Sequence, residues 1–253
     1  MERGFYTAAS GLLSQQKSIN IMSNNIANAT TVGYKNQTAV SSTFGDHLLS
    51  RLNAGNAESS ATVGSSTYMN ITETEHTDFT QGNFESTGRA VDLAIQGNGF
   101  FLLKNSEGKE FLTRNGQFAI DAEGYLVLPG AGYVMNDGND KIQLETTEFT
   151  VTKTGAIMIG SDEADKLYIA VPEDGEGLDH VANGVFANEK GYTQAEENTN
   201  AVLQGVVEKS NVDLAREMSS VISGQNHFQS CSQILKIFDR INEITANQIG
   251  KIG

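Results

Sequence analysis

Residues 5–29 carry apolar side chains at alternating steps of three and four, which is the spacing of a heptad seam along an α-helix. Gln15 interrupts the apolar character of that seam, and a polar seam residue lowers stability but can fix how partner helices align. An ordinary amphipathic helix packed on a globular core would show the same period. The pattern predicts an N-terminal helix with one face for a partner. The seam positions are Phe5, Ala8, Leu12, Gln15, Ile19, Met22, Ile26 and Ala29.

The C-terminal segment repeats this spacing after Asp213, which can cap or charge the start of a helix. One extra step of three makes the seam wander slightly over the helix surface. Gly224 weakens an isolated helix but allows another helix to come close. We therefore predict a second helix that pairs with the first. Its seam positions are Met218, Val221, Gln225, Phe228, Cys231, Ile234, Phe238, Ile241 and Thr245.

Between the two seams the period changes to that of strands. Residues 68–207 are rich in Gly, Thr, Asn and Asp, with short apolar runs at 100–103, 118–120, 125–128 and 167–171. Turn dipeptides such as Asn98-Gly99 and Asn115-Gly116 separate these runs. Residues 36–67, with an apolar group at Leu48, Leu49 and Leu52, indicate a connector containing one short helical turn.

The predicted fold is a mainly β central domain of short antiparallel strands and hairpins, with N- and C-terminal α-helices that pair as a coiled coil. The expected segments are residues 1–35 for the first helix and its exit turn, 36–67 for the connector, 68–207 for the β domain and 208–253 for the second helix. The net charge of -14 is concentrated in the middle, because the charges of residues 1–30 leave +1 and those of residues 210–253 cancel. Near-neutral ends can pack against like copies without repulsion.

Composition excludes several classes of function. An acidic chain has the wrong sign for neutralising the phosphates of a nucleic acid. Cys231 is the only cysteine, so neither an intramolecular disulfide nor a multi-cysteine metal site is expected. No apolar run is long enough for a membrane span, so no membrane insertion is expected, and the first residues lack the pattern of a cleaved signal peptide.

Candidate catalytic and ligand sites fail on residue type or spacing. Gly97-Asn98-Gly99 lacks the third glycine and the helix of a dinucleotide site, and the loop at Asp137 lacks the glycine of a calcium loop. The acidic and histidine residues at 73–78 alternate between the two faces of a predicted edge strand. We expect no catalytic residue, no cofactor and no bound metal.

A motif at the end of the first predicted helix is similar to the N-terminal signature of flagellar rod and hook proteins. Its residues are Asn24, Asn25, Ile26, Ala27, Asn28, Thr31, Val32, Gly33, Tyr34 and Lys35. Residues 92–95, 97–101, 113–118 and 121–127 resemble β-domain motifs of that family, and residues 210–213 with Glu217, Met218 and Ile222 resemble the start of its C-terminal helix. The chain departs from the family after Gln225, where Asn226 and His227 stand in place of an arginine and a small residue.

The resemblance implies a structural subunit of the bacterial flagellar basal-body rod. Such a subunit is exported by the flagellar type III apparatus without a cleaved signal peptide, and it assembles outside the cytoplasm with its own copies and with other rod and hook proteins. A hook subunit is the alternative within the family, and a secreted β-rich carbohydrate-active or carbohydrate-binding protein is the alternative from another class. The expected assembly interface is Phe5, Leu12, Gln15, Ile19, Met22, Ile26, Met218, Val221, Gln225, Phe228, Leu235, Phe238 and Ile241.

Overall fold

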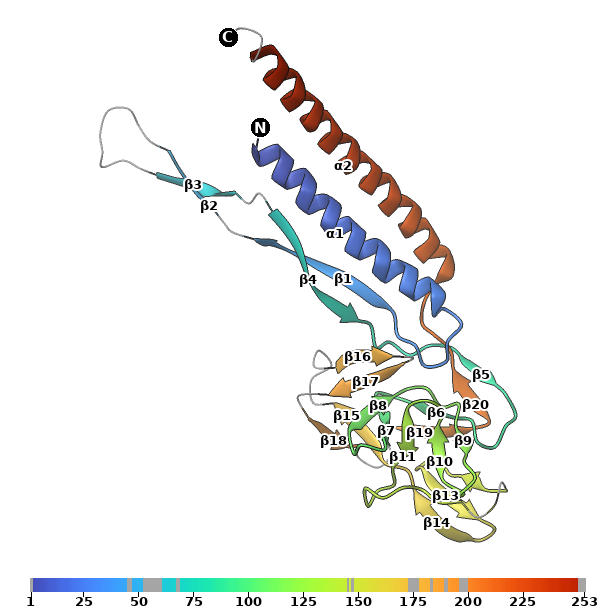
Figure 1. Cartoon of the computed structure of the whole chain (residues 1–253). Coiled ribbons are helices and arrows are strands. Elements are labelled where there is room, and N and C mark those ends of the chain that lie inside the picture. Colours follow the sequence, from blue (N-terminus) through green and yellow to red (C-terminus); the bar gives the residue numbers. More distant parts are fainter. Residues whose placement is uncertain are drawn as a thin grey trace. The chain divides into compact units, whose positions relative to one another are not determined.

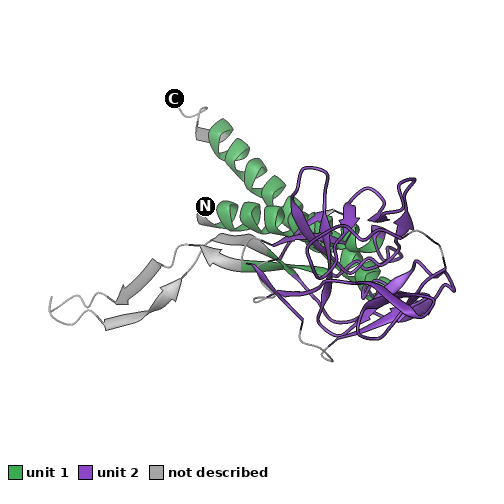
Figure 2. Cartoon of the chain, turned by 90° about the horizontal axis from the view of Figure 1, so that it is seen from below, with its two compact units in different colours: residues 1–26, 37–76, 214–253 green, residues 27–36, 77–213 purple. Residues whose placement is uncertain are grey.

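The structure is a computed structural model of the whole chain. It describes residues 2–44, 47–51, 61–66, 69–144, 146, 148–172, 178–182, 184–188, 191–195 and 200–249. These residues form two compact units, each assembled from separate stretches of the chain (Figure 2). Unit 1 consists of residues 1–26, 37–76 and 214–253, and unit 2 consists of residues 27–36 and 77–213.

Two long helices dominate unit 1 (Figure 1). Helix α1 spans Glu2–Ala27 and helix α2 spans Leu214–Ile249, and neither contains a proline. Glu217 lies in the first turn of α2, where a negative charge interacts favourably with the helix dipole. The two predicted terminal helices are confirmed.

Strands complete unit 1. Strand β1 (Gln37–Phe44) pairs with β4 (Met69–Thr77), and β2 (His47–Arg51) pairs with β3 (Ala61–Ser66) in an antiparallel hairpin (Figure 1). Leu48 and Leu49, part of the connector in which the sequence predicted one short helical turn, lie in strand β2. A strand at residues 69–77 agrees with the alternation predicted for the acidic and histidine residues.

Unit 2 is built from short antiparallel strands, as the sequence predicted. Its largest sheet has nine strands, with β7 near the centre pairing with β8, β11 and β15. The strands of this sheet are β7 (Phe100–Lys104), β8 (Glu110–Thr113), β9 (Ala119–Ile120), β10 (Leu126–Leu128), β11 (Gly132–Val134), β15 (Ile169–Pro172), β16 (Leu178–Ala182), β17 (Val185–Asn188) and β18 (Tyr192–Gln194). Smaller sheets pair β5 (Phe84–Ser86) with β20 (Val206–Glu208), β6 (Leu93–Gln96) with β19 (Ala201–Gln204), and β12 (Thr150–Val151) with β13 (Ala156–Ile159) and β14 (Asp162–Lys166).

The apolar run at residues 100–103 forms a strand that is buried on both faces. Side chains of a strand alternate between its two faces. Phe101 and Leu103 accordingly lie in the larger apolar cluster of unit 2, whereas Phe100 and Leu102 lie in the smaller one. Strand β7 therefore separates two cores, which explains why this segment is continuously apolar and not alternating.

Candidate functional site

A buried ion cluster in unit 2 joins three segments that are distant in the sequence. Lys35 Nζ lies 2.7 Å from Glu208 Oε1, and Arg114 Nη1 lies 3.4 Å from Glu208 Oε2. The side chains of Lys35 and Glu208 are both 1% exposed. Lys35 follows the helix exit, Arg114 follows β8 and Glu208 ends β20, so the cluster fastens the segments where the chain enters and leaves unit 2.

Hydrogen bonds to backbone groups reinforce this cluster, although Arg114 Nε is buried without a hydrogen-bond partner. Lys35 Nζ donates to the Thr80 carbonyl at 2.8 Å, and the Gly82 amide donates to Glu208 Oε1 at 2.8 Å. Arg114 Nη2 donates to the Gly97 carbonyl at 2.7 Å. Burial lowers the pKa of Lys35, although the carboxylate of Glu208 opposes that shift. The cluster is a structural anchor whose members depend on one another, because removing one partner leaves a buried charge without compensation.

The motif residues next to Lys35 also enter the interior of unit 2. Tyr34 is fully buried, and its ring makes an edge contact with His180 at 5.6 Å between centroids. Gly33 has a φ of 69°, a region that favours glycine, and a Cβ there would lie 2.4 Å from the Asn115 amide nitrogen. Both the conformation and the close approach therefore require glycine at position 33.

Asparagine side chains bind backbone groups on either side of the motif. Within unit 1, Asn25 Nδ2 donates to the Gln37 carbonyl at 2.8 Å and Asn25 Oδ1 accepts from the Gln37 amide at 3.1 Å. Within unit 2, Asn211 Oδ1 accepts from the Asn36 amide at 2.7 Å, and its Nδ2 donates to the Asp78 carbonyl at 2.9 Å. Asn25 therefore links the end of α1 to the first residue of β1. Asn211, which precedes α2, links that segment to the backbone at Asn36 and Asp78. Of the other motif residues, Asn24 and Ala27 are exposed and Asn28 is half-buried.

The two helices of unit 1 contact each other at glycines. A Cβ at Gly4 would lie 2.8 Å from Phe238 Cζ, and a Cβ at Gly11 would lie 3.7 Å from Cys231 Sγ. On the other helix, a Cβ at Gly224 would lie 2.8 Å from Gln15 Nε2. The close approach that Gly224 permits, as expected from the sequence, is thus present in the structure.

The predicted interface residues differ in how far they are exposed. Half-buried positions are Leu12, Gln15, Ile19, Met22, Ile26, Val221, Phe228, Leu235 and Phe238. Exposed positions are Phe5, Met218, Gln225 and Ile241. The half-buried group includes Gln15, Ile19 and Met22, which surround Gly224. The single seam predicted from the sequence therefore contains residues that occupy different surfaces of the helices.

Other large apolar residues of the helices are exposed and were not included in the predicted interface. Leu13 of α1 is 69% exposed, and Ile222 and Ile237 of α2 are 61% and 58% exposed. Ile234, Ile237, Ile241 and Ile244 follow one another at steps of three and four, so they form one apolar stripe along α2. We call these four residues the outer stripe. Ile234 and Ile241 already belonged to the predicted seam, and the regular steps to Ile237 and Ile244 were the signal that could have identified the other two residues.

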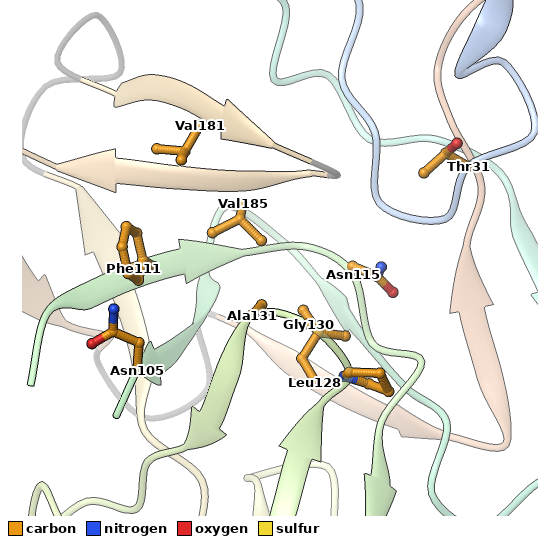
Figure 3. A pocket seen from close by; sticks show the side chains of 10 residues that line it. Thr31, Asn105, Phe111, Asn115, Leu128, Gly130, Ala131, Val181 and Val185 are labelled. Carbon is orange, nitrogen blue, oxygen red and sulfur yellow. The ribbon is translucent and has the colours of Figure 1, made fainter. Parts of the chain in front are cut away.

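Unit 2 also contains a recess of about 430 Å³ (Figure 3). None of its lining side chains is ionisable, so they supply no acid and base pair for catalysis. The lining residues are Thr31, Asn105, Phe111, Asn115, Leu128, Pro129, Gly130, Ala131, Val181 and Val185. In the part of the chain that the structure describes, no three His, Cys, Asp or Glu residues are grouped as metal ligands would be. Neither described helix is long and apolar enough to cross a membrane.

Comparisons with known proteins agree with this architecture. Residues 5–35 match the family model "Flagella basal body rod protein", residues 94–159 match "Flagellar hook protein FlgE/F/G D1 domain", and residues 203–249 match "Flagellar basal body rod FlgEFG protein C-terminal". The flagellar basal-body rod protein FlgG of Bacillus subtilis is 31% identical over 98% of this chain and 99% of its own length. The rod protein FlgF of Caulobacter vibrioides is 27% identical over 100% of this chain and 99% of its own length.

Both relatives match along essentially their whole length and carry the name of rod proteins. The resemblance seen in the sequence motifs is confirmed, and the enzyme alternative is set aside. The chain therefore belongs to the family of flagellar basal-body rod proteins, and it is a structural subunit and not an enzyme.

Proposed function

We propose that this rod subunit polymerises through its terminal helices into the axial shaft that transmits torque in the flagellum. Its partners are copies of itself and other rod and hook proteins. Within each subunit, α1 and α2 pair as a coiled coil, and the pair offers its remaining apolar surface to neighbouring subunits. Membership of the rod-protein family supports the role as a rod subunit, and the exposed apolar residues of the helices support assembly through them.

The observation that carries this proposal is the outer stripe of α2. Taking about 100° of rotation for each helical residue, its centre lies about 100° around α2 from the face that holds Gly224, Cys231 and Phe238. A single helix partner cannot cover both faces. Contiguous exposed apolar surface on a folded protein marks an interaction site. The outer stripe is therefore free to bind another subunit after α1 has been packed.

The distribution of charge also distinguishes the helical ends, which are proposed to assemble, from the middle of the chain. The sequences of both helical ends are close to neutral, whereas the middle of the chain carries the acidic excess. Like copies can pack through neutral ends without strong repulsion, and an acidic middle keeps the exposed part soluble. Open polymers grow when identical copies make head-to-tail contacts that do not close into a ring.

A charge placed in the outer stripe tests the proposal. Ile237→Glu should abolish rod assembly and motility in cells that depend on this subunit, because the carboxylate would be buried without a partner. Gln229→Glu adds the same charge at an exposed polar position of α2 and should assemble normally. Electron microscopy of isolated basal bodies and swimming assays measure the outcome. Normal rods with Ile237→Glu would contradict the proposal.

We also propose that the subunit is exported by the flagellar type III apparatus without a cleaved signal peptide, and that the terminal helices become fully ordered when neighbours bind. Two helices that bury little surface gain most of their stability from tertiary packing. Hydrogen exchange should be fast in residues 5–28 of dilute monomer and slow in the polymer. Strong protection of these residues in the monomer would contradict ordering upon assembly.

The hook is the alternative location within the flagellum. The relatives that cover this whole chain and are named rod proteins favour the rod. Labelling the subunit in isolated hook-basal bodies distinguishes the two. Label inside the rod supports the proposal, whereas label along the hook contradicts it.

A further inference from the structure

The contacts between α1 and α2 define an antiparallel register. Gly4 faces Phe238 and Gly11 faces Cys231, so seven residues forward on α1 correspond to seven residues backward on α2. The next such step on α2 reaches Gly224, which faces Gln15, Ile19 and Met22 on α1. Each layer of this contact therefore places a glycine against a larger side chain of the other helix.

The layer at Gly224 is the most tightly filled of the three. A Cβ there would lie 2.8 Å from Gln15 Nε2, 3.1 Å from Ile19 Cγ1 and 3.4 Å from Met22 Cε. Gly224 is buried, although its neighbours Ser223 and Gln225 are exposed. Glycine in a helix interior costs about 1 kcal/mol relative to alanine. Its presence at this point is explained by the side chains that occupy the space of its missing Cβ.

A shift of one heptad would disturb this layer in either direction. One shift would bring Cys231 opposite Gln15, Ile19 and Met22, whose atoms lie 2.8 to 3.4 Å from the position of a Cβ at Gly224 and would have to move to admit a Cβ and a sulfur. The opposite shift would bring Glu217 there and place a carboxylate against Ile19 and Met22, at a cost in desolvation. The observed register is the one in which the residue facing this group has no side chain.

We infer that Gly224 is the register-determining residue of the terminal helix pair. Its missing side chain leaves the space that the side chain of Gln15 occupies. The sequence indicated Gln15 as a polar residue that could fix alignment, and the structure adds the position on α2 that receives it. This inference rests on the proposed pairing of the helices within one subunit. It determines which part of α2 meets which part of α1, and hence how the outer stripe is presented.

A disulfide trap measures the register directly. Gly11→Cys creates a partner for Cys231, whose Sγ lies 3.7 Å from the position of the new Cβ, so a small rotation brings the sulfurs to about 2 Å. Mild oxidation of the full-length subunit in its assembled form should give an intramolecular bond between residues 11 and 231, identified by mass spectrometry of the linked peptides. Leu13→Cys, on the exposed face of α1, is the matched control and should not form it.

The role of Gly224 is tested in the same background. Gly224→Leu combined with Gly11→Cys should lower the yield of the intramolecular disulfide at least tenfold, whereas Ser223→Leu, an exposed neighbour, should leave the yield unchanged. Circular dichroism checks that both variants keep their helical content. An unchanged yield with Gly224→Leu, equal trapping by Leu13→Cys, or exclusively intermolecular disulfides would overturn the inference.

The two proposals fail in different ways. If trapping does not depend on Gly224 but rods still assemble and Ile237→Glu abolishes them, the register inference is wrong and the proposed function remains. If trapping follows the register but Ile237→Glu assembles normally, the inference remains and the outer stripe is not the assembly surface.

Discussion

Unit 2 buries its large apolar side chains in two clusters, whereas the helices of unit 1 leave many of theirs in contact with solvent. Ile157 in unit 2 is 0% exposed, and Ile237 in unit 1 is 58% exposed. The two isoleucines are chemically identical and differ in whether their own unit supplies a complete set of neighbours. Unit 2 therefore contains its own core, while the helices of unit 1 keep large apolar side chains exposed.

Charged residues show the same contrast. Unit 2 holds Lys35, Arg114 and Glu208 in its interior, where their geometry is fixed by neighbouring carbonyl and amide groups. In unit 1 the ion pair between Lys17 and Glu75 spans 4.0 Å, and both side chains are substantially exposed. Surface pairs of this kind contribute about 0 to 1 kcal/mol. The ion pairs of unit 2 around Glu208 are thus buried and fixed in geometry, whereas the Lys17–Glu75 pair of unit 1 lies at the surface.

The largest expected loss of stability follows from breaking the buried cluster. Glu208→Leu leaves Lys35 and Arg114 without their carboxylate and should lower the free energy of unfolding by about 3 to 5 kcal/mol. Glu85 on the paired strand provides a control, because its ion pair with Lys209 is exposed and Glu85→Gln should cost at most about 1 kcal/mol. Urea denaturation of the two full-length variants gives the comparison. Equal losses would show that the buried cluster contributes no more to stability than the exposed ion pair.

The same truncation in the two units tests the difference in burial. Ile157→Ala should lower the free energy of unfolding by about 2 to 5 kcal/mol, because it leaves a cavity in the core of unit 2. Ile237→Ala should change it by at most about 0.5 kcal/mol in the monomer, because that side chain is largely exposed. Thermal melts of dilute protein measure both. A large effect of Ile237→Ala in the monomer would mean that the outer stripe is already covered.

Substitution of Gly33 tests the turn that leads into unit 2. Gly33→Ala should cost more than about 1 kcal/mol, since the positive φ disfavours alanine and the new Cβ would meet the backbone of Asn115. Gly88 has a similar φ of 70°, but a Cβ there would have no neighbouring atom within 4 Å, so Gly88→Ala isolates the cost of conformation alone. Equal melting temperatures for the two variants would contradict a role for the close approach.

Local periodicity predicted the helices and the β architecture, because each depends on neighbouring residues in the chain. It did not predict the ion cluster, since Lys35 and Glu208 are separated by 173 positions and no local pattern reports their contact. Lys35 and Arg114 lie within the motifs that resemble those of the family, but Glu208 lies outside them. A glutamate at the end of an apolar strand was its one local signal.

The faces of α2 were predicted less well than its existence. Beyond the extra three-residue step, the predicted seam combined Cys231 and Phe238, which contact α1, with Ile234 and Ile241 of the outer stripe. A sequence shows where apolar residues lie on one helix, but a helix with two apolar faces does not reveal which face meets which partner. In the structure, the contacts at Gly4, Gly11 and Gly224 show which face of α2 packs against α1.

The smallest expected effect concerns a tyrosine at the surface of unit 2. Burial, followed by the hydrogen bond from Tyr192 Oη to Glu110 Oε2 at 2.6 Å, raises the pKa of Tyr192 above its ordinary value. A raised pKa means that the folded state keeps the phenol proton after the unfolded state has lost it, so this stabilisation is complete below about pH 10 and declines above it. Tyr192→Phe should therefore cost about 1 kcal/mol at pH 8, and its deficit should shrink as the pH rises beyond 10. Parallel urea titrations of the wild type and the variant at several pH values measure the difference, and a deficit that grows above pH 10 would contradict the assignment.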